Sequence, residues 1–156
     1  MGDKGVLFSR LSLAALLGLR AAASPVAFGA SAMVEDGEGR VLLARHGYMK
    51  GWSFPGGGVN RNEPPQVAVM REMTEEIGLL SCDPPEFFGL YTRKVGWTTN
   101  VIALYRVTGA VLDFKPNFEI REIRFCDPAL PPDGTTDGTL RRLAELTGKA
   151  PRNPYW

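Results

Sequence analysis

One stretch of sequence, residues 53–79, constrains the fold of this chain more than any other. Its three consecutive glycines, Gly56–Gly58, indicate a turn with exposed backbone. Pro64 suits the first turn of a helix, where the amide that proline lacks would be unpaired in any case. Gly78 suits the C-terminal cap, because glycine adopts the left-handed conformation at little cost. We therefore predict a helix over about residues 64–77.

This predicted helix carries an apolar face, and Asn62 or Glu63 is its expected N-cap. Its apolar positions fall within an arc of about 100° when each residue turns the helix by about 100°. A stripe of this width is typical of a helix that packs on a sheet. Its members are Gln66, Val69, Met70, Met73 and Ile77.

An acidic face lies beside the apolar stripe. Glu72 and Glu76 are one turn apart and differ by about 40° around the axis, while Glu75 projects about 60° to the other side of Glu72. Two like charges at 4 Å repel by about 4 kcal/mol at an effective dielectric constant near 20, so a bound cation would relieve a real cost. The candidate side-chain ligands are all oxygens, which favours Mg²⁺, with Mn²⁺ as the substitute, over zinc.

The spacing of this segment resembles the signature of the Nudix hydrolase family, from Gly57 to Leu79. The matching positions are Gly57, Glu63, Arg71, Glu72, Met73, Glu75, Glu76, Gly78 and Leu79. The resemblance implies a magnesium-dependent hydrolase that cleaves a phosphoanhydride bond in a nucleoside diphosphate linked to another group. In such a reaction water attacks one phosphorus of the diphosphate, and the substrate is a small nucleotide or nucleotide derivative.

The resemblance also implies a set of metal ligands. The carbonyl of Gly57 and the carboxylates of Glu72 and Glu76 are the principal expected ligands, with Glu75 as a further ligand or as the general base. The other candidate for the base is Glu119, since family members also draw this carboxylate from a later loop.

Two further box residues are expected to position the others. Arg71 stands one turn before Glu75, and an ion pair between them would hold that carboxylate in place during catalysis. Glu63 is expected to be structural, because a carboxylate at the entry of the helix can accept bonds from the free amides of the first turn. Gly78 is structural as the cap.

Residues outside the box are candidates for substrate contacts. Aromatic rings can stack on a base, and basic side chains and imidazole can contact phosphates. The candidates are His46, Tyr48, Lys50, Trp52, Arg93, Lys94 and Trp97.

The rest of the chain predicts an α+β fold, an α/β/α sandwich with a mixed sheet between helices. Residues 25–34 and 41–44 resemble the two strands of a hairpin. Later strands are expected at residues 86–94, 98–108 and 120–125, and a closing helix at residues 137–146. We expect an N-terminal helix or arm over residues 1–24, a single domain over residues 25–150 and a C-terminal tail over residues 151–156.

Composition narrows the partners and the compartment. The net charge of +1 leaves no broad basic field for extended nucleic acid. The apolar segment 11–24 imitates a secretory signal, but Arg20 interrupts it and it is too short to span a bilayer. We therefore expect a cytoplasmic protein without membrane contact, in which residues 11–23 cap the core or serve a homodimer interface.

Two alternatives use the same fold. The first is a non-catalytic nucleotide-binding or regulatory module, which the retained Glu72, Glu75 and Glu76 disfavour. The second is isopentenyl diphosphate isomerase, whose chemistry relies on a catalytic cysteine motif. Cys82 and Cys126 stand outside any such motif and are expected to be small buried hydrophobes.

Overall fold

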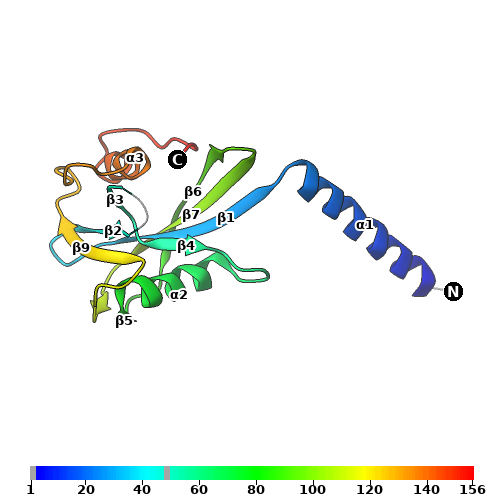
Figure 1. Ribbon diagram of the computed structural model, residues 1–156, viewed down its shortest axis with the longest axis horizontal. Coiled ribbons are helices and arrows are strands. Elements are labelled where there is room, and N and C mark those ends of the chain that lie inside the picture. The colour runs from blue at the N-terminus through cyan, green and yellow to red at the C-terminus, as the bar shows by residue number, and fades with distance from the viewer. Residues whose placement is uncertain (1–2, 48–49) are drawn as a thin grey trace.

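The structure is a computed structural model that describes residues 3–47 and 50–156, with side chains described from residue 13 onward except at 48 and 49. Helices and strands follow one another along the chain as shown in Figure 1. Their bounds are α1 (Asp3–Ala23), β1 (Val26–Val34), β2 (Val41–His46), β3 (Trp52–Ser53), β4 (Gly56–Gly58), α2 (Pro65–Ile77), β5 (Leu79–Ser81), β6 (Glu86–Val95), β7 (Thr98–Val107), β8 (Val111–Leu112), β9 (Ile120–Cys126) and α3 (Asp137–Leu146).

The described residues form a four-stranded mixed sheet in the order β4-β1-β7-β6. Strand β1 runs parallel to β7, whereas β4 and β6 pair antiparallel with their neighbours. A second, antiparallel sheet has the order β3-β2-β9, and β5 pairs with β8. The α+β class and the mixed sheet between helices are confirmed.

Two apolar cores lie on opposite faces of the four-stranded sheet. On β1, the side chains of Ala30, Ala32 and Val34 pack toward α2, while the intervening Met33 packs in the core that contains Leu143 of α3. This alternation follows from the two-residue period of a strand. Figure 1 shows α2 and α3 on either side of the strands.

The predicted hairpin of residues 25–34 and 41–44 is wrong. An antiparallel bridge between Glu35 and Val41 joins the ends of the two segments, but β1 continues into the four-stranded sheet and β2 into the other. The turn signal around Asp36 is real, since its carboxylate accepts the amides of Glu38 and Arg40. The partners of β1 come from far along the chain, and local turn chemistry does not identify them.

Helix α2 lies where the sequence predicts it, with two differences. Its N-cap is Pro64, and no side chain among the described residues caps it. Gly78 closes it in the left-handed conformation, at φ 68°. Val69, Met73 and Ile77 are buried, with Met70 partly buried beside them, whereas Gln66 is exposed and its polar side chain donates to the carbonyl of Pro85.

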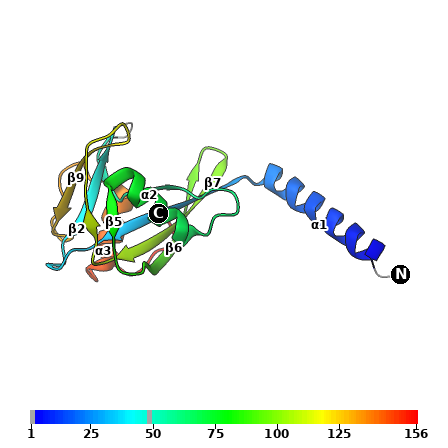
Figure 2. The same ribbon diagram turned by 90° about the horizontal axis from the view of Figure 1, so that it is seen from below.

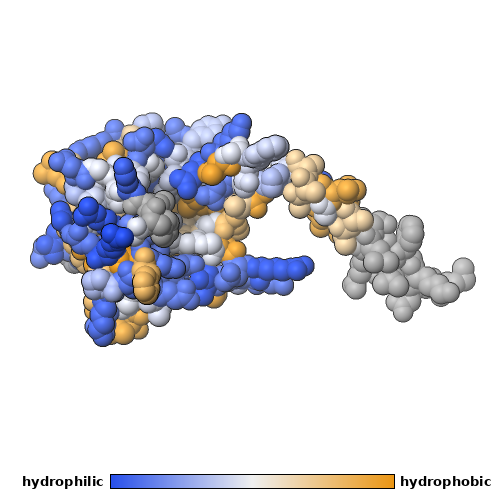
Figure 3. Space-filling view, viewed as in Figure 1, coloured by the Kyte–Doolittle hydropathy of each residue, from blue (hydrophilic) through white to orange (hydrophobic). Residues whose placement is uncertain are grey.

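The N-terminal segment is helical, as expected, and extends away from the body (Figure 2). From Leu13 to Ala23 its side chains are exposed, so α1 does not cap the core. Figure 3 shows apolar side chains along this part of α1. Among the described residues no helix, α1 included, has the length and apolar character needed to cross a bilayer.

Candidate active site

Strand β4 and helix α2 meet at two close contacts that involve glycines and glutamates. The amide of Gly56 donates a 2.7 Å hydrogen bond to Oε2 of Glu76. One residue later, Gly57 lies directly against the carboxylate of Glu72, in the space that a Cβ would fill. These contacts place two carboxylates of the helix beside the exposed backbone of β4.

Arg71 joins the loop before α2 to the acidic turn of α2, which carries Glu72, Glu75 and Glu76. Its guanidinium donates to both carboxylate oxygens of Glu63, at 2.9 and 3.0 Å. It also donates to Glu72 at 2.6 Å, to Glu75 at 3.3 Å and to the carbonyl of Gly58 at 2.9 Å. The expected ion pair between Arg71 and Glu75 is present, and it is one contact of a larger network.

Glu63 fixes the loop in a different way from the one expected. It accepts the amide of Asn60 at 2.8 Å as well as the guanidinium of Arg71, and not the amides of the first helical turn. The hydrogen bond from Arg71, helped by that from Asn60, lowers the pKa of Glu63 to about 2. Pro64 and Pro65 have no amide hydrogens, which removes two of the donors that the expected arrangement would use.

Glu76 is the most deeply buried carboxylate of the acidic face, with 2% of its surface exposed. Burial raises its pKa to about 7, and the negative charges of Glu72, Glu119 and Glu75 act in the same direction. His46 Nδ1 lies 3.8 Å from Glu76 Oε1, and burial lowers the pKa of this histidine. Both pKa shifts favour the neutral forms of Glu76 and His46. The contact is therefore close packing and not a full ion pair.

The loop before β9 brings a further carboxylate to this region. Asn117 anchors the loop to α2 by donating from Nδ2 to the carbonyl of Glu76 at 3.1 Å, and its Oδ1 accepts the amide of Glu119. The carbonyl of Glu119 accepts the amide of Gly47 at 2.8 Å. Glu119 lies close enough to act electrostatically on both Glu76 and His46. The structure thus brings Glu119 to the acidic turn from a distant part of the chain.

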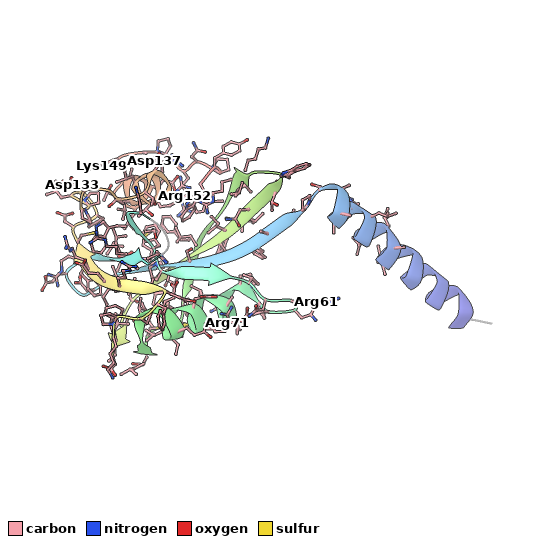
Figure 4. The ribbon with its side chains drawn as sticks, in the orientation of Figure 1. Arg61, Arg71, Asp133, Asp137, Lys149 and Arg152 are labelled. Atoms are coloured by element: carbon pink, nitrogen blue, oxygen red, sulfur yellow. The ribbon has the colours of Figure 1, made fainter. Side chains whose placement is uncertain are left out.

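A cavity of about 630 Å³ opens on the α3 side of the sheet, next to β4. Its floor comes from β1, β7 and β6, and its opposite wall from the start of α3 and the end of the chain. Figure 4 shows Asp137 on the α3 side and Arg71 on the α2 side. Its lining includes Gly57, Arg93, Asn100, Gly138, Arg141 and Trp156.

A second cavity, of about 650 Å³, lies at the loop after β2. Arg45, Lys50 and Arg121 line it together with Glu122, which pairs with Arg45. His46 borders both cavities. Of the expected substrate contacts, His46 and Arg93 line the first cavity and His46 and Lys50 the second.

Other expected substrate contacts lie elsewhere. Trp52 is 5% exposed in the core, with the guanidinium of Arg124 4.7 Å from its ring centroid, so the expectation that it stacks on a base is wrong. Trp97 is 95% exposed at the turn between β6 and β7 and is not part of either cavity lining. Lys94 precedes this turn and is exposed. Tyr48 lies outside the described residues.

The donor set fits a hard divalent cation. Glu72, Glu75, Glu76 and the Gly57 carbonyl offer only oxygens, which are the ligands that such a cation prefers. Within the described residues no three acidic, cysteine or histidine side chains already converge on one point. The side chain of Glu75 is 56% exposed and contacts Arg71.

Comparison with known proteins decides the family. The family model of the NUDIX domain matches residues 25–145. The chain belongs to the Nudix family. Solved Nudix structures share its fold: the MutT NUDIX hydrolase from Burkholderia pseudomallei superposes with a TM-score of 0.70 at 20% identity, covering 79% of this chain and 99% of that one. A UDP-X diphosphatase gives 0.63 at 17% identity, covering 94% of this chain and 74% of that one.

Curated Nudix relatives match over a shorter stretch. The RNA pyrophosphohydrolase of Methylococcus capsulatus is 37% identical over 65 residues, which is 42% of this chain and 32% of that protein. The chain thus aligns with about a third of the length of the curated relatives it matches.

Trp156 and Asn100 line the cavity and were not identified from the sequence. A signal for Trp156 was present, since two aromatic residues, Tyr155 and Trp156, end a tail of six residues. A large aromatic side chain gains free energy when it finds a partner surface, so two adjacent aromatic residues favour docking of this segment against the domain. Asn100 carries no comparable signal.

Proposed function

We propose that this chain is a magnesium-dependent pyrophosphohydrolase that cleaves a phosphoanhydride bond in a nucleoside diphosphate linked to another group. The observation that carries the proposal is the contact of Gly57 with Glu72, because it puts a carboxylate directly against a strand residue that lines a cavity. Mg²⁺, when bound, supplies charge neutralisation of phosphate oxygens and a polarised water. Glu72, Glu76 and the Gly57 carbonyl would hold it, with Glu75 as a further ligand.

We assign the general base to Glu119, with Glu75 as the alternative. Glu119 lies near Glu76, and its loop is anchored to α2 through Asn117. One carboxylate oxygen of Glu75 already accepts a hydrogen bond from Arg71. Arg71 is a positioning residue, because its guanidinium orders Glu63, Glu72 and Glu75 together.

A second candidate substrate is the triphosphorylated 5′ end of an RNA. The basic side chains in the lining of the second cavity, Arg45, Lys50 and Arg121, favour it, since such side chains bind phosphates. The relatives named RNA pyrophosphohydrolase support it too. Recognition of one chain end needs a local patch and not a broad basic surface, so the net charge of +1 is compatible with it.

A substrate panel tests both candidates. Nucleoside triphosphates, nucleotide sugars, ADP-ribose, dinucleoside polyphosphates and a 5′-triphosphorylated RNA are incubated with Mg²⁺, and products are separated by chromatography. At least one compound is expected to be cleaved, with loss of cleavage in EDTA and in Glu76→Gln, and with ¹⁸O from labelled water in a phosphate product. Metal-dependent binding without cleavage of any compound would instead indicate a non-catalytic module.

A further inference from the structure

The end of the chain docks beside strand β6 through main-chain hydrogen bonds. Thr92 donates its amide to the carbonyl of Pro154 at 2.9 Å, and its carbonyl accepts the amide of Trp156 at 2.8 Å. Tyr155 thereby forms a parallel bridge with Thr92. Residues 152–156 therefore occupy a defined position along the edge of the sheet.

Helix α3 holds the same segment from the other side. The fully buried guanidinium of Arg142 donates to the carbonyl of Tyr155 at 3.1 Å and to Glu145 at 2.7 Å. Glu145 also accepts the amide of Asn153 at 2.8 Å, and Arg141 donates to the backbone oxygen of Trp156. A buried charge left without its partners is costly, so these bonds make the docked tail part of the domain.

The docked tail places the indole of Trp156 in the wall of the first cavity. The ring packs edge-to-face on Tyr91, at 5.8 Å between centroids, and on Phe54, at 6.4 Å. A Cβ at Gly138 would overlap the indole, so the glycine at the start of α3 makes room for it. Trp156 is only half-buried, and part of its surface borders the cavity.

The β1 part of the cavity floor carries small residues, in register with residues of β7 and β6. Ala27, Asn100 and Arg93 form one row across β1, β7 and β6, and Gly29 and Ile102 belong to the next row. Such short side chains on β1 leave open space in the cavity that Trp156 walls. Asn100 offers both a donor and an acceptor to a ligand in that space.

We infer that Trp156 is a substrate-binding residue on which the planar base of the substrate stacks, with Asn100 bonding the edge of the base. Aromatic faces bind any base through stacking, and a cavity of about 630 Å³ is in the range that holds a nucleoside. Gly57 lies at the same cavity with Glu72 directly against it, so the diphosphate of a stacked nucleotide extends toward the acidic turn. This inference rests on the proposed function for the class of substrate.

Calorimetric titration tests the inference without requiring turnover. The probes are AMP, GMP, CMP and UMP, with ribose 5-phosphate as their base-free match, and the variants are Trp156→Ala, Trp156→Phe and Tyr155→Ala. Tyr155 is the matched control, because it is an aromatic residue of the same tail with a 67% exposed side chain. Circular dichroism and thermal melts check the fold of each variant.

Trp156→Ala is expected to weaken at least one nucleotide about 5- to 150-fold, as loss of one base–aromatic stack predicts. Binding of ribose 5-phosphate is expected to be unchanged, Tyr155→Ala to match the parent, and Trp156→Phe to keep most of the affinity. Should Trp156→Ala fail to fold, Gly138→Ala displaces the indole without removing it, and the same nucleotide-specific loss is expected.

Equal nucleotide affinity in the parent and Trp156→Ala would overturn the inference, as would an equal loss for ribose 5-phosphate. A different set of results would refute the proposed function. Base-dependent binding that needs Trp156, without cleavage of any compound in the panel, would refute hydrolysis and support the stacking role. Cleavage with an unchanged KM in Trp156→Ala would refute the stacking role alone.

Discussion

Gly57 and Glu72 face each other where β4 meets α2, with no room between them for a side chain. A Cβ at position 57 would lie 2.5 Å from the carboxyl carbon of Glu72, far inside van der Waals contact. The neighbouring pair, Gly56 and Glu76, is joined by a hydrogen bond of 2.7 Å. Each of these two glycines of β4 therefore contacts one glutamate of α2.

Gly57→Ala should lower activity about 10- to 100-fold, the usual cost of disturbing the surroundings of a metal ligand. The added methyl group displaces the Glu72 carboxylate, whose position the proposed site needs. Gly58→Ala is the matched control, because a Cβ there meets nothing within 4 Å, and it should stay close to the parent. Steady-state kinetics at several Mg²⁺ concentrations compares them, and equal activity of the two variants would contradict the prediction.

Glu119→Gln should lower kcat by a factor of about 10² to 10⁴, the typical contribution of a general base. The Mg²⁺ concentration for half-maximal rate should change little, since the amide keeps the volume and Glu119 is not among the proposed ligands. Glu86→Gln, an exposed carboxylate at the start of β6 that is not part of either cavity lining, serves as the control. A large loss in Glu75→Gln with an unaffected Glu119→Gln would transfer the base to Glu75.

Glu63 should make stability depend on pH. Its pKa is about 2 in the folded chain because of the hydrogen bond from Arg71, whereas an unfolded glutamate titrates near 4.5. A lowered folded pKa stabilises the fold fully above the unfolded value, and this contribution is lost as pH falls from about 4.5 toward 2. Urea unfolding at several pH values should show the gap between the parent and Glu63→Gln shrinking over that window.

A gap that stays constant from neutral pH to pH 3 would contradict this assignment. An Arg71→Met background provides the control, because the guanidinium that lowers the pKa is then absent. In that background the pH dependence due to Glu63 should largely disappear.

Sequence patterns within a few residues predicted those helices and turns whose ends are set by the same residues. Gly78 stops α2 because a left-handed cap needs glycine, and Gly96 in the turn between β6 and β7 has φ 58°. The predicted closing helix coincides with α3, Asp137–Leu146. The spacing of the acidic residues likewise predicted that Glu72 and Glu76 would lie together.

Local sequence signals did not identify the elements that contact one another across long stretches of chain. The parallel pairing of β1 with β7 joins segments about 70 residues apart, and no turn encodes it. Trp52 reads as a loop aromatic, yet it pairs in β3 and packs in the core beside Arg124. The position of Trp156 at the cavity depends on the docking of the tail against β6 and α3, and no local signal identifies these two partners.

The central claim is that the acidic turn of α2 binds a divalent cation. Electron paramagnetic resonance titration with Mn²⁺ tests this claim most directly. The free ion signal reports binding by the parent chain and by Glu72→Gln, Glu76→Gln and Glu122→Gln, each checked for folding. The account predicts saturable binding by the parent and by Glu122→Gln, competed by Mg²⁺, and a loss of at least about tenfold in affinity in the other two. Equal Mn²⁺ affinity in all four proteins would contradict it.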